Sequence, residues 1–392
     1  MKHLSISTSR AIWFVFIGFL FFSLEALAAD VVKVGAVQPV TGRFAFAGIH
    51  INAGLEDALM MANEEGGING KQIEYIMEDG TYKTDVALAA FKRIMSRDNP
   101  PVLYGESTAL GKAVSPEIKD RYKILYTSTS FSSELADPEK NPYIFVPGPT
   151  YSDMFGILLK YIAQEKPGAN VAFYYSDTEF GRDPIASGRE MCKQLGLNLV
   201  AEEVSKVGGV DVSTQVLDMK RKNAEYVIFQ GFVLSPVDAV IKQSRDYGLK
   251  AKFMGTFWGT HKMLLDKLGP LAEGYMGVMP YAFYWQEEIP MIKKIRAWNE
   301  KHHPDISYRP TSYMQGFMSG LILIESLRRA DAMGQLNGEG LVKALQSIEN
   351  LDVQGLMAPV SIVSNKIPMG RVYRANSKTK MFEPVSDWIN VE

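Results

Sequence analysis

The 392-residue sequence contains a single cysteine, Cys192, so no internal disulfide is possible. The stability of the folded chain must then come from packing and hydrogen bonding, without covalent cross-links within the chain. Cys192 lies in the stretch 190–195, where the spacing of apolar residues is typical of a helix. We expect its thiol to be buried in the packing face of that helix, without a chemical role.

The sequence also lacks an excess of charge of either sign. Its 42 Lys and Arg against 44 Asp and Glu give a formal net charge of −2. Loss of the first 28 residues would remove Lys2, Arg10 and Glu25 and change this charge to about −3. A footprint for nucleic acid or for an acidic membrane surface would need a clear excess of Lys and Arg. No nucleic-acid partner is therefore expected.

A long apolar run is missing as well. The run 11–24 has 14 residues, fewer than the roughly 20 that a membrane-spanning helix needs. Lys2 and Arg10 precede it, and Ala26-Leu27-Ala28 offers the small residues that a signal peptidase reads. Residues 1–28 are thus predicted to be a cleavable signal peptide, with an uncleaved anchor as the alternative. The mature protein is predicted to be periplasmic.

Motifs of common enzyme classes are absent or incomplete. The stretch 105–112 resembles a phosphate-binding loop, but five residues separate Gly105 from Gly111, and Ala113 stands where Ser or Thr would bind Mg²⁺. No G-x-G-x-x-G opens the first predicted helix, and no G-x-S-x-G surrounds a serine. We expect neither catalysis nor a cofactor, and an exported enzyme is the alternative from another class.

Histidines are few, and they form no metal-binding motif. Those that follow the predicted signal peptide are His50, His261, His302 and His303, and none belongs to an H-E-x-x-H site. His302 and His303 end a predicted helix that begins near residue 288, where a cation complements the helix dipole. His261 is predicted to start a helix. No bound metal is expected.

What the sequence does have is an alternation of short β-branched runs with segments of helical periodicity. The first set of predicted elements comprises strands 31–37, 72–78, 102–104 and 124–126 and helices 51–65, 84–97 and 109–121. A strand at 143–146 is followed by Pro147-Gly148-Pro149, which interrupts the alternation. The second set comprises helices 151–165, 184–195, 213–222 and 236–247 and strands 171–175, 199–204 and 226–230. This order predicts an α/β fold with two doubly wound parallel sheets, because some 360 residues are too many for one core.

Doubly wound sheets bind ligands at the carboxyl ends of their strands, so the loops there form the candidate site. These loops are 38–48, 105–109, 127–132, 176–181, 231–235 and 255–261. Two of them are rich in hydroxyl groups, which suit a small carboxylate: Ser107, Thr108, Thr127, Ser128, Thr129 and Ser130. The others carry aromatic residues: Phe44, Phe46, Phe180, Phe232, Phe257 and Trp258. Helix capping is the alternative role for each hydroxyl, and core packing for each aromatic ring.

Several motifs resemble those of the type I periplasmic solute-binding proteins of ABC transporters, in the group that binds leucine and other branched-chain amino acids. The resemblance covers essentially the whole chain after the predicted signal peptide. The motifs that carry it are V-G-A-V-Q-P-V-T-G at 34–42, E-G-G-I-N-G-K at 65–71, G-P-T-Y-S at 148–152, E-F-G-R at 179–182 and Q-S-R-D-Y-G-L-K at 243–250. Each is weak alone, but their order and spacing are specific.

The resemblance implies two Rossmann-like lobes that close on a ligand about a hinge of three chain crossings. Carried over to this sequence, the crossings fall near 146–149, 279–282 and 356–359. The lobes would comprise 29–146 with 282–357 (N-terminal) and 147–281 with 358–392 (C-terminal). The implied partners are a small-molecule carboxylate and an inner-membrane ABC permease with its ATPases, and the protein is expected to be a monomer.

In the amino-acid-binding proteins that the sequence resembles, hydroxyl and N–H groups after the third and fourth strands hold the ligand carboxylate. The matching residues here are Ser107, Thr108, Ala109, Thr129 and Ser130. The ligand ammonium meets a glutamate in the loop that corresponds to 255–260, but this sequence has no acid there. An unpaired ammonium in a closed cleft would cost several kcal/mol, which argues against an ordinary α-amino acid.

Aromatic side chains take the place of that acid. The wall around the ligand is assigned to Phe46, Phe180, Phe232, Phe257 and Trp258. A hydrophobic or aromatic carboxylate, with benzoate-like acids foremost, is therefore the predicted ligand. Branched-chain amino acids and small amides are the alternatives, and a ligand sensor of the same fold is a further one.

Two acids near the candidate loops could restore an ammonium site. Glu106 stands beside the hydroxyl residues, and Asp177 lies in the loop 176–181. Either carboxylate could supply the missing anionic partner. A solvated surface position is the alternative for both.

Overall fold

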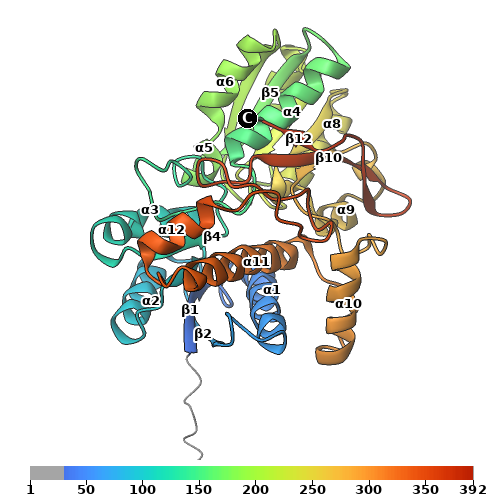
Figure 1. The fold of residues 1–392 in the computed structure, drawn as a ribbon. Coiled ribbons are helices and arrows are strands. Elements are labelled where there is room, and N and C mark those ends of the chain that lie inside the picture. Colours follow the sequence, from blue (N-terminus) through green and yellow to red (C-terminus); the bar gives the residue numbers. More distant parts are fainter. Residues whose placement is uncertain (1–30, 392) are drawn as a thin grey trace, which may run out of the picture. The chain divides into compact units, whose positions relative to one another are not determined.

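The computed structural model describes residues 31–391, which form two β-sheets covered by helices (Figure 1). The predicted signal peptide lies outside the described residues. Within 31–391, no helix combines the length and the apolar character needed to cross a membrane. The predicted α/β class with two sheets is confirmed.

The first sheet has four parallel strands in the order β2-β1-β3-β4. They are β1 (Val31–Gln38), β2 (Gln72–Asp79), β3 (Val102–Gly105) and β4 (Leu125–Ser128). The helices in this part are α1 (Ala45–Glu64), α2 (Thr84–Arg97), α3 (Thr108–Glu117), α10 (Pro290–His302), α11 (Thr311–Ala332) and α12 (Gly338–Gln346). All four predicted strands are confirmed, with shifts of one or two residues at their ends.

The second sheet follows the order β11-β10-β9-β8-β7-β5-β6, and β12 pairs with β10. Its strands are β5 (Asn170–Ser176), β6 (Asn198–Ser205), β7 (Tyr226–Gln230), β8 (Lys252–Gly255), β9 (Met276–Met279), β10 (Met369–Asn376), β11 (Met381–Pro384) and β12 (Ile389–Asn390). The helices in this part are α4 (Tyr151–Glu165), α5 (Glu179–Arg182), α6 (Ile185–Gln194), α7 (Ser213–Arg221), α8 (Val237–Asp246) and α9 (Lys262–Leu268). Cys192 is buried in α6, as predicted.

The edge of the second sheet differs from the purely parallel arrangement that the sequence predicted. β10 runs antiparallel to both β9 and β11. The β10–β11 hairpin turns at 377–380, where the Asn376 side chain accepts hydrogen bonds from the N–H groups of Lys378 and Thr379. Antiparallel edge strands on otherwise parallel sheets are common in α/β folds.

Helix α1 begins six residues earlier than the predicted start at 51. The Ala45 N–H donates to the Gly42 carbonyl at 3.3 Å, which opens the helix directly after the turn. Gly48 lies inside the helix. A larger residue would not fit there, because a Cβ at this position would lie 2.1 Å from the Pro39 carbonyl oxygen. This glycine therefore serves a close approach of two backbone segments and does not interrupt the helix.

Two further elements differ from the prediction. The predicted helix 109–121 is divided: α3 ends at Glu117, and a π-helical turn covers Ile118–Tyr122. Pro116 has no N–H for the regular helical ladder, which explains the change of pitch. The predicted strand 143–146 is not a strand, and Ile144 makes only an isolated bridge with Tyr126.

Helix α4 starts at the predicted residue because its cap is encoded locally. The Thr150 hydroxyl accepts the Asp153 N–H at 3.1 Å, and the Asp153 carboxylate accepts the Thr150 N–H at 2.8 Å. This reciprocal pair is a capping box, which satisfies two N–H groups of the first turn. Its position directly after 147–149 starts the second set of elements.

Helices α1 and α11 pack unusually closely and lie beside each other in Figure 1. A Cβ at Gly54 would lie 2.1 Å from the Tyr313 carbonyl oxygen, and one at Gly316 would lie 2.0 Å from the Ile51 carbonyl oxygen. Glycine on each helix thus allows the two backbones to touch. This contact attaches the later part of the chain to the first sheet.

A buried acid on α1 accepts hydrogen bonds from three side chains in the same region. Asp57 accepts hydrogen bonds from the Tyr313 hydroxyl at 2.7 Å, from Arg309 at 3.2 Å and from His303 Nε2 at 2.8 Å. His303 follows the last residue of α10, as expected, but its ring bonds to this carboxylate. Asp57 and Arg309 are both buried, so each compensates the charge of the other.

Replacing Asp57 by Ala should lower the free energy of unfolding by about 3–5 kcal/mol, because Arg309 would remain buried without its partner. Glu64→Ala on the same helix removes an exposed pair with Lys301 and should cost less than about 1 kcal/mol. Urea denaturation of both variants measures the difference. Equal losses would contradict the assignment of Asp57 as a buried anchor.

Candidate functional site

The strand order of the first sheet places its topological switch point, where doubly wound sheets have their binding crevice, between the ends of β1 and β3. Val34 and Ala36 of β1 pack with residues of α1, whereas Val37 packs with residues of α2 and α3. The chain therefore leaves β1 toward one face of the sheet and leaves β3 toward the other. Ligands of doubly wound sheets bind at such a switch point, outside the carboxyl ends of the strands.

The predicted hydroxyl residues meet on one side of this crevice. The hydroxyls of Thr108 and Ser130 lie 2.7 Å apart, and the Thr129 hydroxyl donates to the backbone carbonyl of Glu106. Ser107 caps α3 by accepting the Leu110 N–H at 3.1 Å, which was the alternative role for this residue. All four hydroxyl residues are buried.

The first turn of α3 adds backbone donors to these hydroxyls. Thr108 and Ala109 are the first two residues of that helix. N–H groups in the first turn have no acceptor within the helix and carry the positive end of the helix dipole. Together with the hydroxyls they can hold a carboxylate.

Predicted aromatic residues connect the loops of the two sheets. The ring centroids of Phe257 and Trp258 are 5.0 Å apart. Phe257 contacts Phe131, which directly follows Ser130, at 5.0 Å, and Trp258 contacts Phe44 at 5.3 Å. The loop after β8 thus meets the loops after β1 and β4, and its aromatic rings lie next to the hydroxyl residues.

Phe180 is joined to the same group through a residue that the sequence did not single out. Its ring lies 4.9 Å from that of Tyr151, and Tyr151 lies 5.9 Å from Phe131. Gln230 Nε2 donates to the Phe180 carbonyl at 2.8 Å, and the Thr256 hydroxyl donates to Gln230 Oε1 at 2.6 Å. These bonds position the loops after β5, β7 and β8 relative to one another.

Two predicted wall residues lie at the margin of this group. Phe232 is buried and packs against Tyr174, with ring centroids 5.9 Å apart. Phe46 is 39% exposed, and its ring lies 5.2 Å from that of Phe44. Among the described residues, the ring contacts that join the other aromatic residues do not include Phe232, and Phe46 takes part in them through Phe44.

A mostly apolar pocket of about 180 Å³ lies beside the aromatic group. It is lined by Phe46, Ala47, His50, Val233, Phe257, Trp258, His261, Lys262, Met263, Tyr308, Pro310, Thr311 and Ser312. His261 starts α9, as predicted, and its Nε2 lies 2.9 Å from the Val233 carbonyl oxygen. Burial lowers the pKa of His261 to about 4, so its ring is neutral at pH 7 and adds no charge to the pocket.

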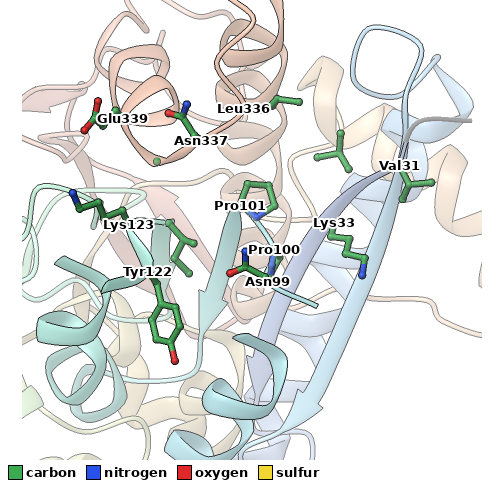
Figure 2. A pocket seen from close by; sticks show the side chains of 13 residues that line it. Val31, Lys33, Asn99, Pro100, Pro101, Tyr122, Lys123, Leu336, Asn337 and Glu339 are labelled. Atoms are coloured by element: carbon green, nitrogen blue, oxygen red, sulfur yellow. The ribbon is translucent and has the colours of Figure 1, made fainter. Parts of the chain in front are cut away.

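A larger pocket of about 670 Å³ lies at the opposite end of the first sheet. Figure 2 shows its lining around the start of β1 (Val31 and Lys33), the segment before β3 (Asn99 to Pro101) and the start of α12. These are the amino ends of the strands. This pocket is therefore not part of the crevice where the fold binds ligands.

Glu106 is the predicted acid that lies in the crevice. Its side chain is buried, and Oε2 accepts the Tyr82 N–H at 3.2 Å. Oε1 is buried without a hydrogen-bond partner among the described residues. Burial, and next the negative charge of Asp79, raise the pKa of Glu106 to about 7. Asp177, by contrast, is exposed and its Oδ1 lies 2.6 Å from Arg182 Nε.

Residues after β2 also belong to the crevice, although the predicted loops did not include them. Tyr82 stacks on Phe44 with ring centroids 4.4 Å apart, and the Thr81 hydroxyl is buried without a partner among residues 31–391. Gln38, at the end of β1, is buried, and neither atom of its side-chain amide has a hydrogen-bond partner in the part of the chain that the structure describes. The rule that selected the loops after the other strands would have found Thr81 and Tyr82.

No group of His, Cys, Asp and Glu side chains in the described part of the chain has an arrangement suited to a metal ion. The candidate site therefore consists of hydroxyl groups, helix N–H groups, aromatic rings and one unpaired carboxyl. Such a set can bind a small polar head group and enclose an apolar body.

Comparison with known proteins gives consistent results. The family model described as periplasmic binding protein matches residues 31–378. The Leu/Ile/Val/Thr-binding protein of Salmonella typhimurium is 24% identical over 308 residues, which cover 78% of this chain and 83% of the relative. The leucine-, isoleucine-, valine-, threonine-, and alanine-binding protein of Pseudomonas aeruginosa is 22% identical, with 70% and 72% covered.

Solved structures support the fold. A branched chain amino acid ABC transporter from Thermus thermophilus with bound valine matches with a TM-score of 0.81 and 25% identity, covering 92% of this chain and 96% of that one. A fatty acid ABC transporter substrate-binding protein from Thermomonospora curvata matches with a TM-score of 0.78 and 21% identity, covering 93% of both chains. At that identity the second match concerns the fold alone.

Because the pKa of the Glu106 carboxyl is raised in the folded protein, we predict that the free energy of unfolding depends on pH. The folded-state pKa of about 7 is higher than the ordinary value of 4.5, so stability falls as the pH rises through about 7. Glu106→Gln removes this loss. The gain in unfolding free energy over the wild type should be about 1–2 kcal/mol larger at pH 8 than at pH 5.

Urea denaturation of the ligand-free protein at the two pH values measures this difference. Glu139→Gln, at an exposed position, serves as the control and should change stability equally at both. If the unfolding free energies of Glu106→Gln and the wild type depend on pH in the same way, the surroundings of Glu106 do not raise the pKa of its carboxyl.

Proposed function

Because the chain belongs to the periplasmic binding protein family, we propose that it is the substrate-binding protein of an ABC importer and binds a small carboxylate with a hydrophobic or aromatic body. The relatives named above are binding proteins for leucine, isoleucine, valine and threonine, and one of them also for alanine, which supports a binding role without catalysis. The similarity to a Thermus thermophilus protein described as an ABC transporter supports a membrane permease with its ATPases as the partner, and the description of the family model supports the periplasm as the location.

The observation that carries this proposal is the junction of polar and aromatic groups at the carboxyl edge of the first sheet. Ser130 belongs to the hydroxyl cluster, and the next residue, Phe131, touches Phe257 from the other sheet. A ligand between these loops would meet hydroxyl and N–H groups at one end and aromatic rings at the other. Ser107, Thr108, Ala109, Thr129 and Ser130 are the proposed carboxylate ligands.

The pocket beside Trp258 offers a place for the apolar body. Its lining is mostly aromatic and aliphatic, and the neutral ring of His261 adds no charge to it. Burial of an apolar group yields roughly 25 cal/mol per Å² of surface removed from water. Phe257 and Trp258 belong both to this pocket and to the aromatic contacts near the hydroxyls. Phe46, Phe180 and Phe232 are the outer members of the proposed wall.

We further propose that residues 29–146 with 282–357 and residues 147–281 with 358–392 act as two lobes. The sheet pairing of β10 with β9 and the contact of α11 with α1 support this division. The three proposed crossings lie together: the Tyr281 hydroxyl donates to the Pro147 carbonyl, and the Ala282 N–H donates to the Leu356 carbonyl, each at 2.6 Å. Adjacent crossings can act as one hinge.

Polar contacts between the proposed lobes support binding by closure. Asp183 accepts hydrogen bonds from the Ser133 N–H at 3.1 Å and from the Ser133 hydroxyl at 3.0 Å. Lys112 on α3 forms an ion pair with Glu179 on α5 at 2.6 Å. A ligand that bridges the two sides would favour the arrangement in which these contacts form.

A thermal-shift screen of refolded, ligand-free protein tests this function. The panel contains leucine, valine, benzoate, 4-hydroxybenzoate, phenylacetate and urea. A ligand at a hundred times its dissociation constant stabilises a protein by about 2.7 kcal/mol, so a carboxylate that fits should raise Tm measurably. Urea at the same concentration should not, and a response to none of the carboxylates would contradict the proposal.

The wall is tested by Trp258→Ala. The loss of its ring contacts with Phe257 and Phe44 should lower the affinity for the carboxylate that binds most tightly by at least about tenfold. Losses of this size are typical of a buried aromatic anchor. Trp388→Ala, at a half-buried tryptophan next to Arg371, is the matched control and should leave affinity unchanged. Equal affinities for the two variants would remove Trp258 from the site.

A further inference from the structure

We propose that Asp183 holds the two proposed lobes together when the ligand carboxylate is bound, and that it does so without touching the ligand. It acts through Ser132 and Ser133, in the loop after β4, which donate hydrogen bonds to its carboxylate. Asp183 is thus a positioning residue. This inference rests on the proposed function, because it concerns how the same site closes on its ligand.

Both oxygens of the Asp183 carboxylate accept hydrogen bonds from the other proposed lobe. Oδ2 accepts the Ser132 hydroxyl, and Oδ1 accepts the Ser133 N–H at 3.1 Å and the Ser133 hydroxyl at 3.0 Å. Asp183 directly follows α5, in the proposed C-terminal lobe, whereas both serines precede the first proposed crossing at 146–149. Hydrogen bonds to an ionised acceptor are stronger than those between neutral groups. The carboxylate therefore joins the two lobes at a point outside the proposed ligand contacts.

A run of hydrogen bonds connects these donors to the proposed carboxylate ligands. The Ser132 N–H donates to the Ser130 hydroxyl oxygen at 3.1 Å, and the hydroxyls of Ser130 and Thr108 lie 2.7 Å apart. The Ser130 N–H in turn donates to the Ser128 hydroxyl oxygen at 3.2 Å. A bond between a serine oxygen and the N–H two residues later forms a tight turn of the backbone. The positions of Ser132 and Ser133 are therefore tied to that of Ser130.

The segment 130–133 couples the bound carboxylate to closure. A carboxylate held by Ser130 would fix the start of this segment, and the bonds to Asp183 would fix its end. Phe131 lies between them and contacts Phe257 of the other proposed lobe, with ring centroids 5.0 Å apart. The proposed ligand contact, the aromatic wall and the bonds between the lobes thus lie on four consecutive residues. A ligand that orders this segment would favour the closed arrangement.

A lysine of the first proposed lobe compensates the negative charge at this contact. Lys112 on α3 forms ion pairs with Glu134 and with Glu179 on α5, each at 2.6 Å. Its positive charge also favours the ionised form of Asp183. The closed arrangement therefore does not leave the Asp183 carboxylate between the lobes without a compensating charge.

Helix capping does not account for the position of the Asp183 side chain. Asp183 lies between α5 and α6, where an acid commonly accepts N–H groups of the helix that follows. In the part of the chain that the structure describes, α6 begins without a side-chain cap. The carboxylate instead accepts groups that lie about 50 residues earlier in the sequence. Its contacts therefore serve the junction of the lobes and not the local helix.

Asp183→Ala tests this role, with Asp177→Ala as the matched control. Asp177 belongs to the same proposed lobe, is exposed and pairs with Arg182. Leucine, benzoate and phenylacetate are the probes, and isothermal titration calorimetry measures Kd for the probe that the wild type binds most tightly. Asp183→Ala should raise this Kd at least about tenfold, because the apparent affinity falls with the population of the closed form. Asp177→Ala should leave Kd within about twofold of the wild type.

A double-mutant cycle with Ser132→Ala separates this coupling from a general loss of stability. Ser132→Ala alone should raise Kd at least about threefold. Asp183→Ala should then raise Kd by a smaller factor in the Ser132→Ala background than in the wild type, because one bond of the pair is already lost. The same factor in both backgrounds would overturn the proposed contact.

A variant that carries both Ser132→Ala and Ser133→Ala keeps the test decisive if Asp183→Ala folds poorly. It removes both hydroxyl donors from the opposite lobe and should also raise Kd at least about tenfold. A wild-type Kd in either this variant or Asp183→Ala would overturn the role of Asp183 and leave the proposed function standing. If the wild type binds none of the three probes, the proposed function is overturned as well.

Discussion

The site depends on one constraint of chain topology, which is the order β2-β1-β3-β4 of the first sheet. With this order, the chain must leave β1 and β3 toward opposite faces, and a crevice opens between the two loops. Glu106 and Ser107 follow β3, and the backbone carbonyl of Glu106 accepts the Thr129 hydroxyl from the loop after β4. The arrangement of hydroxyls and acid is thus a consequence of strand order and not of a local sequence motif.

Aromatic packing supplies the second half of the site. Phe131 and Phe44 from one sheet meet Phe257 and Trp258 from the other, so the same rings that would enclose a ligand also join the two sides. Aromatic contacts of this kind contribute about 0.5–1.5 kcal/mol each beyond simple burial. Under the proposed function, ligand affinity and closure would therefore be coupled through the same side chains.

Most helices and strands could be predicted from periodicity, because caps such as Thr150 with Asp153 are encoded within a few residues. The antiparallel strand β10 could not, since its partner β9 lies far away in the sequence. The candidate loops were found by one topological rule, but its omission at β2 left out Thr81 and Tyr82. The burial of Glu106 involves Tyr82, whose N–H donates to its carboxylate from a different loop. Spacing in the sequence does not reveal a contact between separate loops.

The central claim is that the loops at the carboxyl edge of the first sheet bind a small carboxylate with a hydrophobic or aromatic body. Mass spectrometry of the small molecule released when protein purified from growing cells is denatured tests this claim directly. The account predicts a small carboxylic acid with such a body, bound in about one copy per chain. Release of a small molecule without a carboxyl group would contradict it.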